Sequence, residues 1–286
     1  MNLHITAPPP GAGSREALSP SVRIGMPHLS LTGLSENWLL KECGHRHWFL
    51  LAAAAGDSVP DFRDAAGDQV YAVFRAVAIR DARFERVAEN DELHFISSLS
   101  RISRTQFTSV HHLIRGGGKV GEVELISSFV KRTNPEVNRS VARVNLEAFP
   151  FAGQATQSAL ADLAGPFWSD SWSSHRGFQR EQAGLSGSLI VRPNPSIDFN
   201  GARFLYFASF PALADRAEWD ILSPPPHLTT VGREVFYYGN IEPGDEIVIR
   251  IGATAASGTD LIHWCALHRR CDDARLADIF TTRRAV

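Results

Sequence analysis

The stretch Gly25-Met-Pro-His28-Leu-Ser-Leu-Thr-Gly33 precedes a long apolar run and then four segments with strand character. A second stretch, Asn194-Pro-Ser-Ile-Asp198-Phe-Asn200-Gly201, stands in the same position before another apolar run and further strand-like segments. The chain therefore carries one pattern twice: a loop, a buried helix and a set of antiparallel strands. This duplication predicts two similar units in tandem.

The helix of the first unit is predicted directly after its loop. Ser35 is a suitable N-cap, and Glu36 in the first turn suits the positive end of the helix dipole. From Trp38 to Leu51, apolar side chains at about 100° per residue cover more than half of the circumference. Such a helix is buried on most sides. Glu42 and Arg46, spaced i, i+4 on the apolar face, predict a structural ion pair.

Segments with strand character follow each predicted helix. In the first unit they cover residues 69–79, 92–103, 106–114 and 119–132, with Gly116-Gly-Gly118 as a hairpin turn. In the second unit they cover residues 235–241, 246–253, 260–268 and 276–283. The second helix is predicted from about Ala202 to Trp219 with a kink at Pro211, although the run 204–210 also suits a strand.

These elements predict an α+β fold, the double hot-dog: two tandem hot-dog units, each an antiparallel sheet wrapped around a central helix. The predicted parts are a flexible leader (1–20), the first hot-dog unit (21–134), a connecting segment (135–187) and the second hot-dog unit (188–286). The leader is rich in Pro, Gly, Ala and Ser, and the connecting segment has weak periodicity.

Composition excludes several classes of partner. With 29 Lys+Arg against 31 Asp+Glu, the chain offers no broad positive surface for nucleic acid or anionic lipid. No apolar run approaches the roughly 20 residues that cross a bilayer, and the N-terminus lacks the pattern of a secretion signal. Three cysteines are too few for a disulfide scaffold. We expect a cytoplasmic protein with no nucleic-acid or membrane partner.

One cluster resembles a metal site at first sight. His263, Cys265, His268 and Cys271 lie within nine residues of each other. The segment is a predicted strand, however, and the period of two places His263 and Cys265 on one face and His268 on the other. We therefore expect no metal.

Residues at the two helix entries are candidates for chemistry. His28 precedes the first helix, where an imidazole could act as a general base or bind a thioester carbonyl, or could be a loop histidine bonded to backbone. Asp198 and Asn200 occupy the matching loop of the second unit, although an Asx pair is also a common cap and turn. Gly33 and Gly201 would let a ligand approach backbone N–H groups that could stabilise an oxyanion.

Further polar residues lie on the predicted strands. Tyr237 and Tyr238 are adjacent, so alternation sends them to opposite faces and one of them is expected to face a ligand, close to Asn240. The basic pairs Lys131-Arg132 and Arg269-Arg270 are expected at the surface, with phosphate binding as the alternative.

Several of these motifs together resemble one family. They are Gly25-Met-Pro-His28, Gly33-Leu-Ser-Glu-Asn37-Trp38, Cys43-Gly44, Asp198-Phe-Asn200-Gly201-Ala, Leu205-Tyr206-Phe-Ala and Tyr238-Gly239-Asn240. The family is the group of polyketide-associated biosynthetic proteins that includes the leinamycin-pathway bifunctional acyltransferase/decarboxylase. The resemblance covers nearly all residues from about 22 to 286. It implies a double hot-dog fold and work on an acyl group held by coenzyme A or an acyl carrier protein.

The resemblance also implies that a tyrosine on a strand of the first hot-dog unit carries the acyl group, and Tyr71 lies on such a strand. The expected catalytic residues are His28, Tyr71, Asp198 and Asn200. The expected substrate-binding residues are Gly33, Asn37, Trp38, Gly201, Tyr238 and Asn240. No cofactor is expected besides the coenzyme A thioester as substrate. Acyl-CoA and an acyl carrier protein or polyketide synthase are the expected partners, and a homodimer stays open.

The predicted function is that of an acyl-thioester enzyme of polyketide or related specialised metabolism. It would transfer, with or without decarboxylation, a short malonyl- or methylmalonyl-type acyl group. One alternative is a hot-dog dehydratase, with His28 and either Asp198 or Asp215, or a thioesterase, with Glu36 or Glu42 as the local acid. Another alternative is a non-catalytic acyl-binding partner of a synthase.

Overall fold

The structure is a computed structural model that describes residues 20–144, 155–181, 186–257 and 260–285. The predicted leader lies outside these residues except for Pro20, as do parts of the predicted connecting segment. The helices are η1 (Met26–His28), α1 (Glu36–Ala55), η2 (Phe84–Arg86), α2 (Ala159–Trp168), α3 (Pro195–Asp198) and α4 (Ser209–Leu222). Within the described ranges, no helix is both long and apolar enough to cross a membrane.

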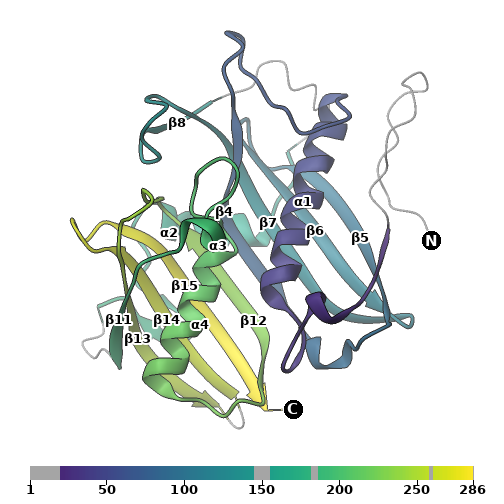
Figure 1. The fold of residues 1–286 in the computed structure, drawn as a ribbon, viewed down its shortest axis with the longest axis vertical. Helices are drawn as coiled ribbons and strands as arrows, with labels where there is room; N and C mark the ends of the chain where they lie inside the picture. The colour runs from purple at the N-terminus through teal and green to yellow at the C-terminus, as the bar shows by residue number, and fades with distance from the viewer. Residues whose placement is uncertain (1–19, 145–154, 182–185, 258–259, 286) are drawn as a thin grey trace.

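One antiparallel sheet runs through both halves of the chain (Figure 1). Its strands from the first half are β1 (Ser21–Arg23), β4 (Tyr71–Arg80), β5 (Glu92–Arg101), β6 (Gln106–Arg115), β7 (Gly118–Arg132) and β8 (Val141–Arg143). Its strands from the second half are β11 (Gly187–Val191), β12 (Leu228–Tyr237), β13 (Ile247–Ser257), β14 (Asp260–Arg269) and β15 (Arg275–Ala285). Their order is β1-β5-β6-β7-β4-β12-β15-β14-β13-β11, with β8 paired to β7. Two short pairs stand apart: β2 (Leu29–Ser30) with β3 (Gly33–Leu34), and β9 (Ser174–His175) with β10 (Phe178–Gln179).

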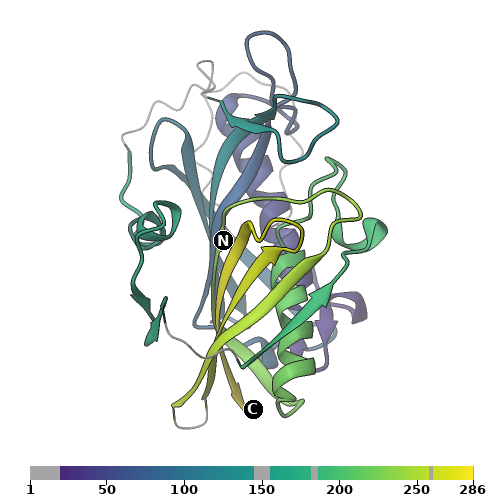
Figure 2. The same ribbon diagram turned by 90° about the vertical axis from the view of Figure 1, so that its left-hand side faces the viewer.

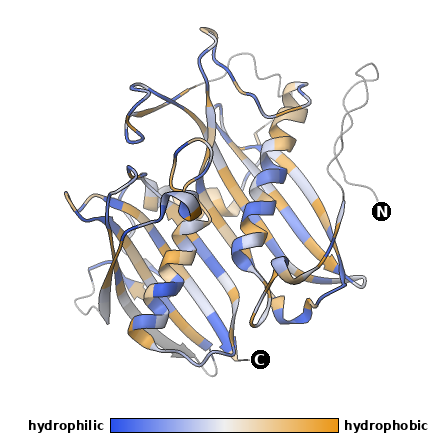
Figure 3. Ribbon diagram, in the orientation of Figure 1, coloured by the Kyte–Doolittle hydropathy of each residue, from blue (hydrophilic) through white to orange (hydrophobic). Residues whose placement is uncertain are grey.

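Each half of the sheet carries one long helix. α1 lies on the strands of the first half and α4 on those of the second, on the same side of the sheet, whereas α2 lies on the opposite side (Figures 1 and 2). Apolar and polar residues alternate along the strands (Figure 3), because one face of each strand packs against a helix. The predicted double hot-dog fold is confirmed.

The two units join where β4 pairs with β12. Residues 76–79 pair in antiparallel order with residues 233–236. Both strands have 10 residues, and each contributes its sixth to ninth residue, so the register obeys a local two-fold axis. Beyond the junction the strands separate on both sides. The first fork lies between the start of β4 and the residues after β12, and the second fork between the start of β12 and the residues after β4.

α1 has the N-cap and the ion pair that its sequence predicts. The Ser35 side chain accepts a hydrogen bond from the N–H of Trp38, and Gly56 ends the helix in the left-handed conformation, with φ 88°. Glu42 and Arg46 are 2.7 Å apart, so the predicted ion pair is confirmed.

The start predicted for the second helix is wrong. Residues 202–208 form turns and a bridge between Phe199 and Leu205, and α4 begins only at Ser209. Pro211 consequently lies in the first turn, where an N–H has no intrahelical partner in any case, and α4 continues past it to Leu222. The aromatic run before Ser209 is therefore available as lining for the first fork.

The connecting segment covers the sheet face opposite α4. Phe167 of α2 stacks on Phe236 of β12, with ring centroids 3.8 Å apart. Beside it, Glu234 of β12 accepts hydrogen bonds from His175 at 2.5 Å and from Arg176 at 2.6 Å. These contacts bury Glu234 and Phe236, a charged and an apolar residue on the same face of β12.

Candidate functional site

A cavity of about 520 Å³ lies in the first fork. Both hot-dog units line it: α1, β4 and β7 from the first, and the loop at 200–207, the start of α4 and residues 237–240 from the second. Most of its lining is apolar, including Trp48, Phe62, Val70, Val73, Phe74, Val130, Phe204, Leu205, Phe207 and Phe210. A cavity of this size and character suits an organic ligand with a few polar groups.

The inner wall is a cluster of aromatic rings. The ring centroid of Phe74 lies 4.3 Å from that of Phe207 and 5.7 Å from that of Trp48. The indole N–H of Trp48 donates to the carbonyl of Ala72 at 2.9 Å, which fixes the ring. Gly44 of α1 lies directly against Phe207, because a β-carbon at position 44 would be 2.8 Å from that ring. This wall is preformed and apolar.

Tyr71, the predicted acyl carrier, lines the cavity at the start of β4. Its hydroxyl accepts a hydrogen bond from Nη1 of Arg132 at 3.4 Å. The Arg132 guanidinium lies 5.2 Å from the centroid of the Tyr71 ring and 4.2 Å from that of Phe204. A guanidinium in this position can stabilise negative charge on the phenol oxygen.

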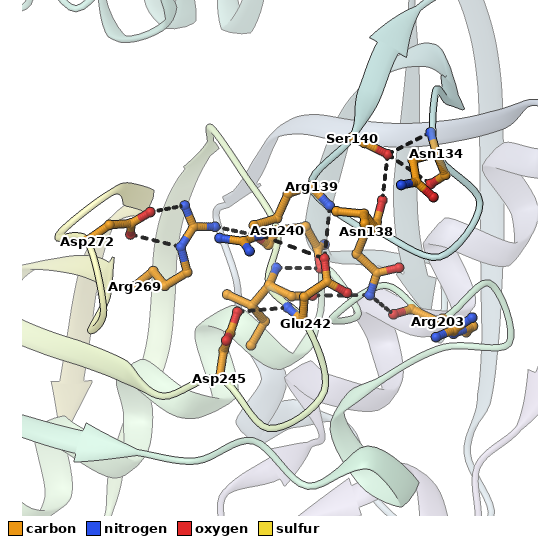
Figure 4. Close-up of polar contacts among 12 residues, drawn as sticks. Asn134, Asn138, Arg139, Ser140, Arg203, Asn240, Glu242, Asp245, Arg269 and Asp272 are labelled. Carbon is orange, nitrogen blue, oxygen red and sulfur yellow. Dashed lines mark hydrogen bonds and ion pairs between the residues drawn. The ribbon is translucent and has the colours of Figure 1, made fainter.

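Asn138 links Arg132 to the backbone of the second unit by hydrogen bonds. Its Oδ1 accepts a hydrogen bond from Arg132 at 2.9 Å. Its Nδ2 donates to the carbonyls of Arg203 at 2.5 Å and Ile241 at 3.1 Å, which belong to the second unit (Figure 4). Arg132 also donates to the carbonyl of Ala202. The cation beside Tyr71 is therefore held partly by contacts with the second unit.

Asn200 and Asn240, which are candidate site residues on sequence grounds, line the cavity. Oδ1 of Asn200 accepts hydrogen bonds from the N–H groups of Ala202 and Phe204, both at 3.1 Å. Oδ1 of Asn240 accepts from the N–H of Leu205 at 2.9 Å, and its Nδ2 donates to the carbonyl of the same residue at 3.1 Å. Their amides hold the loop at 200–205, so they shape the cavity through the backbone.

Three more tyrosines line the cavity. Tyr237 donates to the carbonyl of Phe207 at 3.0 Å, and Tyr238 donates to the carboxylate of Asp278 at 2.5 Å. Alternation predicted that one of these neighbours would face a ligand, whereas both line the cavity because β12 ends at Tyr237. Burial raises the pKa of all three, that of Tyr206 to about 12. They are hydrogen-bonding groups more than nucleophiles.

The charged groups of the cavity are arginines. Arg75 and Arg143 line it, and none of its lining residues is Asp, Glu, His, Cys or Lys within the part of the chain that the structure describes. The hydroxyl of Ser128 is buried there without a hydrogen-bond partner among the described residues. Among the described residues, the cavity lining therefore carries positive charge and no carboxylate or imidazole that could act as a general base.

His28 ends η1 and Gly33 begins β3, both before α1 and outside the cavity lining. Nδ1 of His28 accepts a hydrogen bond from the N–H of Gly25 at 2.8 Å, and its ring lies 4.7 Å from that of Trp38. Gly33 has φ 108°, and a β-carbon there would lie 2.1 Å from the carbonyl oxygen of Phe84. The geometry matches the alternative of a loop histidine bonded to backbone, and Gly33 is required for close packing.

Asn37, Trp38 and Asp198 are also outside the cavity lining. Asn37 donates to the carbonyl of Ala208, the residue before α4, at 3.1 Å. Asp198 is buried, and its carboxylate accepts a hydrogen bond from the N–H of Asn194 at 2.7 Å. Of the predicted residues, the structure thus brings together Tyr71, Asn200, Gly201, Tyr238 and Asn240.

The second fork is closed. The N–H of Ala82 donates to the carbonyl of Val231 at 3.0 Å across it. Arg233, which is 1% exposed, forms two ion pairs in this fork. Its Nε lies 2.8 Å from Oε1 of Glu36, and its Nη2 lies 2.7 Å from Oδ1 of Asp215. Asp215 and Glu36, two of the acids considered for a dehydratase and a thioesterase, are therefore bound to Arg233, away from the cavity lining.

The buried histidines also lie away from the cavity lining. His47 bonds to the hydroxyls of Ser109 at 2.7 Å and Ser127 at 2.8 Å, and burial lowers its pKa to about 3. His263, in the cluster that resembled a metal site, lies 3.1 Å from Glu218. In the described segments, no group of three or more metal-binding side chains is present.

Several residues of the site were not predicted from the sequence: Arg75, Ser128, Asn138 and Arg143. A signal was present for Arg75, which is the one charged residue within the apolar run of residues 70–79. Of the basic pairs, Arg132 bonds to Tyr71, and Arg269, besides its ion pair with Asp272, donates to the carbonyl of Asn240 at 3.2 Å. Lys131 and Arg270 form ion pairs with nearby acids.

No protein-family model matches the sequence, and no curated protein matches it. Solved structures do resemble the chain. A 12:0-ACP thioesterase from Umbellularia californica has a TM-score of 0.66 at 10% identity, with 93% of each chain covered. An acyl-ACP thioesterase from Bacteroides thetaiotaomicron has a TM-score of 0.58 at 10% identity, with 92% of this chain and 96% of that chain covered. At such low identity the likeness establishes the hot-dog fold over nearly the whole chain.

Proposed function

We propose that this protein is an acyl-thioester enzyme that transfers a short acyl group from coenzyme A or an acyl carrier protein by way of Tyr71. The observation that carries the proposal is the pairing of Tyr71 with Arg132 inside a cavity that has no carboxylate or imidazole among its described lining residues. A tyrosine assisted by a fixed cation can act as a nucleophile without a separate general base.

Acylation of Tyr71 needs no reactant besides the thioester. The phenol oxygen of Tyr71 attacks the thioester carbonyl, an ester forms, the carbon–sulfur bond breaks, and the phenol proton ends on the departing thiol. The Arg132 guanidinium stabilises negative charge on the phenol oxygen during attack. A hydroxyl or thiol of an acceptor then takes the acyl group from Tyr71 and returns a proton to it.

Decarboxylation of a malonyl-type thioester suits the same cavity. Loss of carbon dioxide from such a group leaves an enolate, which needs stabilisation at its oxygen and no base to start the reaction. The enolate then takes a proton from water. Polyketide biosynthesis is the setting proposed for either reaction, with an acyl carrier protein or polyketide synthase as partner and no cofactor beyond the substrate thioester.

Hydrolysis is the second candidate, favoured by the structural neighbours, whose names describe acyl-ACP thioesterases. A hydrolase needs a group that takes a proton from water. The described lining of this cavity offers tyrosines, amides and arginines, and it offers no carboxylate or imidazole for that task. Acyl transfer is therefore the first candidate and hydrolysis the second.

The test is to incubate the protein with malonyl-, methylmalonyl- or acetyl-coenzyme A and a carrier protein, and to measure all products by mass spectrometry. An acyl adduct on Tyr71 together with an acylated carrier is the expected result. Release of carbon dioxide without an adduct would keep decarboxylation and remove the role of Tyr71. Free acid as the one product would establish hydrolysis instead, and unchanged substrates would favour a non-catalytic acyl-binding partner.

A further inference from the structure

Arg75 occupies an irregular position in β4. The pairing of β4 with β7 shifts its register between Phe74 and Ala76, so Arg75 is the extra residue of a β-bulge. A bulge directs the side chain of its extra residue out of the regular alternation, and bulges are frequent beside active sites. Phe74 keeps its place in the inner aromatic wall, and Arg75 lines the same cavity.

Trp168 of α2 holds Arg75 from outside the sheet. Its indole N–H donates to the carbonyl of Arg75 at 3.2 Å. The Arg75 guanidinium lies 5.2 Å from the centroid of the Trp168 ring, in a cation–π contact. Both the backbone and the side chain of Arg75 are therefore fixed before a ligand arrives, which lowers the entropic cost of binding.

The charge of Arg75 is not neutralised by a described carboxylate. The charged or ionisable groups that act on it are Arg143 and Tyr238, and its Nε is buried without a hydrogen-bond partner in the described part of the chain. Burial and the charge of Arg143 lower the pKa of Arg75 to about 10, so it stays protonated at neutral pH. The Ser128 hydroxyl of the same cavity, in a residue 1% exposed, lacks a described partner as well. A buried donor without a hydrogen-bond partner is costly, so a ligand that supplies an acceptor to Arg75 and Ser128 would bind favourably.

Resting on the proposed acyl-thioester function, we propose that Arg75, with Arg143 and Ser128 beside it, binds an anionic group of the substrate. Two parts of such a substrate carry oxygen anions: a carboxylate on the acyl group, as in a malonyl unit, and the phosphates of coenzyme A or phosphopantetheine. A guanidinium binds either of them through two parallel hydrogen bonds. Arg75 is then a specificity-determining residue that takes no part in making or breaking bonds.

The experiment measures binding by calorimetry with amide analogues, in which nitrogen replaces the thioester sulfur so that no acyl transfer occurs. Four ligands are compared: malonyl and acetyl groups, each on coenzyme A and on pantetheine, which has no phosphate. The variants are Arg75→Gln and the control Arg86→Gln, an exposed arginine of η2. If the acyl carboxylate is the anion, the wild type prefers malonyl- over acetyl-pantetheine by roughly 10- to 100-fold, and Arg75→Gln abolishes the preference.

If a phosphate is the anion, Arg75→Gln weakens both coenzyme A analogues by the same factor and leaves both pantetheine analogues unchanged. Either pattern supports the proposal and identifies the source of the anion. The proposal is overturned if Arg75→Gln, folded as judged by its melting temperature, binds all four ligands like the wild type. A wild-type protein that binds none of them overturns it as well.

Binding of these analogues requires no turnover, so the subsite and the proposed function can fail separately. Discrimination at Arg75 without any acyl adduct on Tyr71 would keep the anion subsite and refute acyl transfer. Normal adduct formation combined with unchanged binding by Arg75→Gln would keep acyl transfer and refute the subsite.

Discussion

Gly44 of α1 and Phe207 before α4 are packed so closely that a β-carbon on Gly44 would lie 2.8 Å from Cε1 of the phenyl ring. The contact joins the helix of the first hot-dog unit to the loop that enters the helix of the second. Phe207 in turn packs on Phe74, with ring centroids 4.3 Å apart. Gly44 therefore sets how near the second unit approaches α1 and where the aromatic wall of the cavity stands.

We expect Gly44→Ala to destabilise the protein, although alanine is the better helix former. Relief of the clash must move Phe207, which costs about 1–3 kcal/mol of unfolding free energy, and helix propensity returns about 1 kcal/mol. Gly165→Ala in α2 is the matched control, because a β-carbon at that position meets no atom within 4 Å. Urea unfolding should show a loss for Gly44→Ala and a small gain for Gly165→Ala. Equal gains for both would contradict the packing argument.

Tyr71→Phe should abolish the protein-bound acyl group and lower acyl transfer by several powers of ten, since the nucleophilic oxygen is lost. Binding of a substrate analogue should change little, because the ring remains. Tyr206→Phe is the control: Tyr206 lines the same cavity, but burial raises its pKa to about 12 and disfavours its phenolate. Intact-protein mass spectrometry makes the comparison. An adduct that persists in Tyr71→Phe would exclude Tyr71 as the carrier.

Asp215→Asn should destabilise the protein by about 3 kcal/mol, because it removes one of two carboxylates from the buried guanidinium of Arg233. Burial alone would raise the pKa of Asp215, but Arg233 and Arg283 hold it below its usual value. The exposed Asp220 on the same helix provides the control Asp220→Asn. Chemical denaturation at pH 7 compares the two. A loss for Asp215→Asn no larger than that for Asp220→Asn would show that the ion pairs add little.

Glu234 gives a prediction for acid stability. Burial alone would raise its pKa, but hydrogen bonds from His175 and Arg176 lower it from 4.5 to about 2. A carboxyl whose pKa is depressed on folding stabilises the protein above its unfolded value, and this stability is lost as pH falls from about 4.5 towards about 2.

Glu234→Gln should therefore lower the unfolding free energy at pH 6 by about 2–3 kcal/mol and have a much smaller effect near pH 2. Urea denaturation of both proteins at each pH provides the measurement. A difference between wild type and variant that does not depend on pH would show that the carboxylate is not the source.

The sequence predicts the first unit better than the second, for physical reasons that particular residues show. The strands at 92–101 and 106–115 alternate regularly, and the glycines at 116–118 mark their neighbouring turn. β12, in contrast, begins at Leu228 instead of 235, because Arg233 and Glu234 interrupt the apolar pattern. Both charges are balanced by residues from distant segments, which local periodicity does not reveal.

The candidate site could be predicted only in part, because it too depends on contacts between distant segments. Asn200 and Asn240 could be singled out because motifs at the ends of elements contain them, whereas Tyr71 could be singled out only through the resemblance to the polyketide-associated family. His28 has the chemistry of a catalytic residue, but its ring nitrogen bonds to the nearby Gly25. Arg75 enters the cavity only because a bulge turns it, and a bulge depends on the partner strand. The sequence shows which residue types are present, whereas the direction in which each side chain points depends on how the strands pair.

The local two-fold axis at the β4–β12 junction relates one fork that holds a cavity to another that is closed by Ala82, Val231 and Arg233. In a dimer of identical single hot-dog units, any change that sealed one pocket would seal its mate too. Fusion of the two units into one polypeptide removes that constraint, so one fork can hold the two units together while the other keeps a cavity for a ligand. A titration should therefore saturate at one equivalent of ligand per chain.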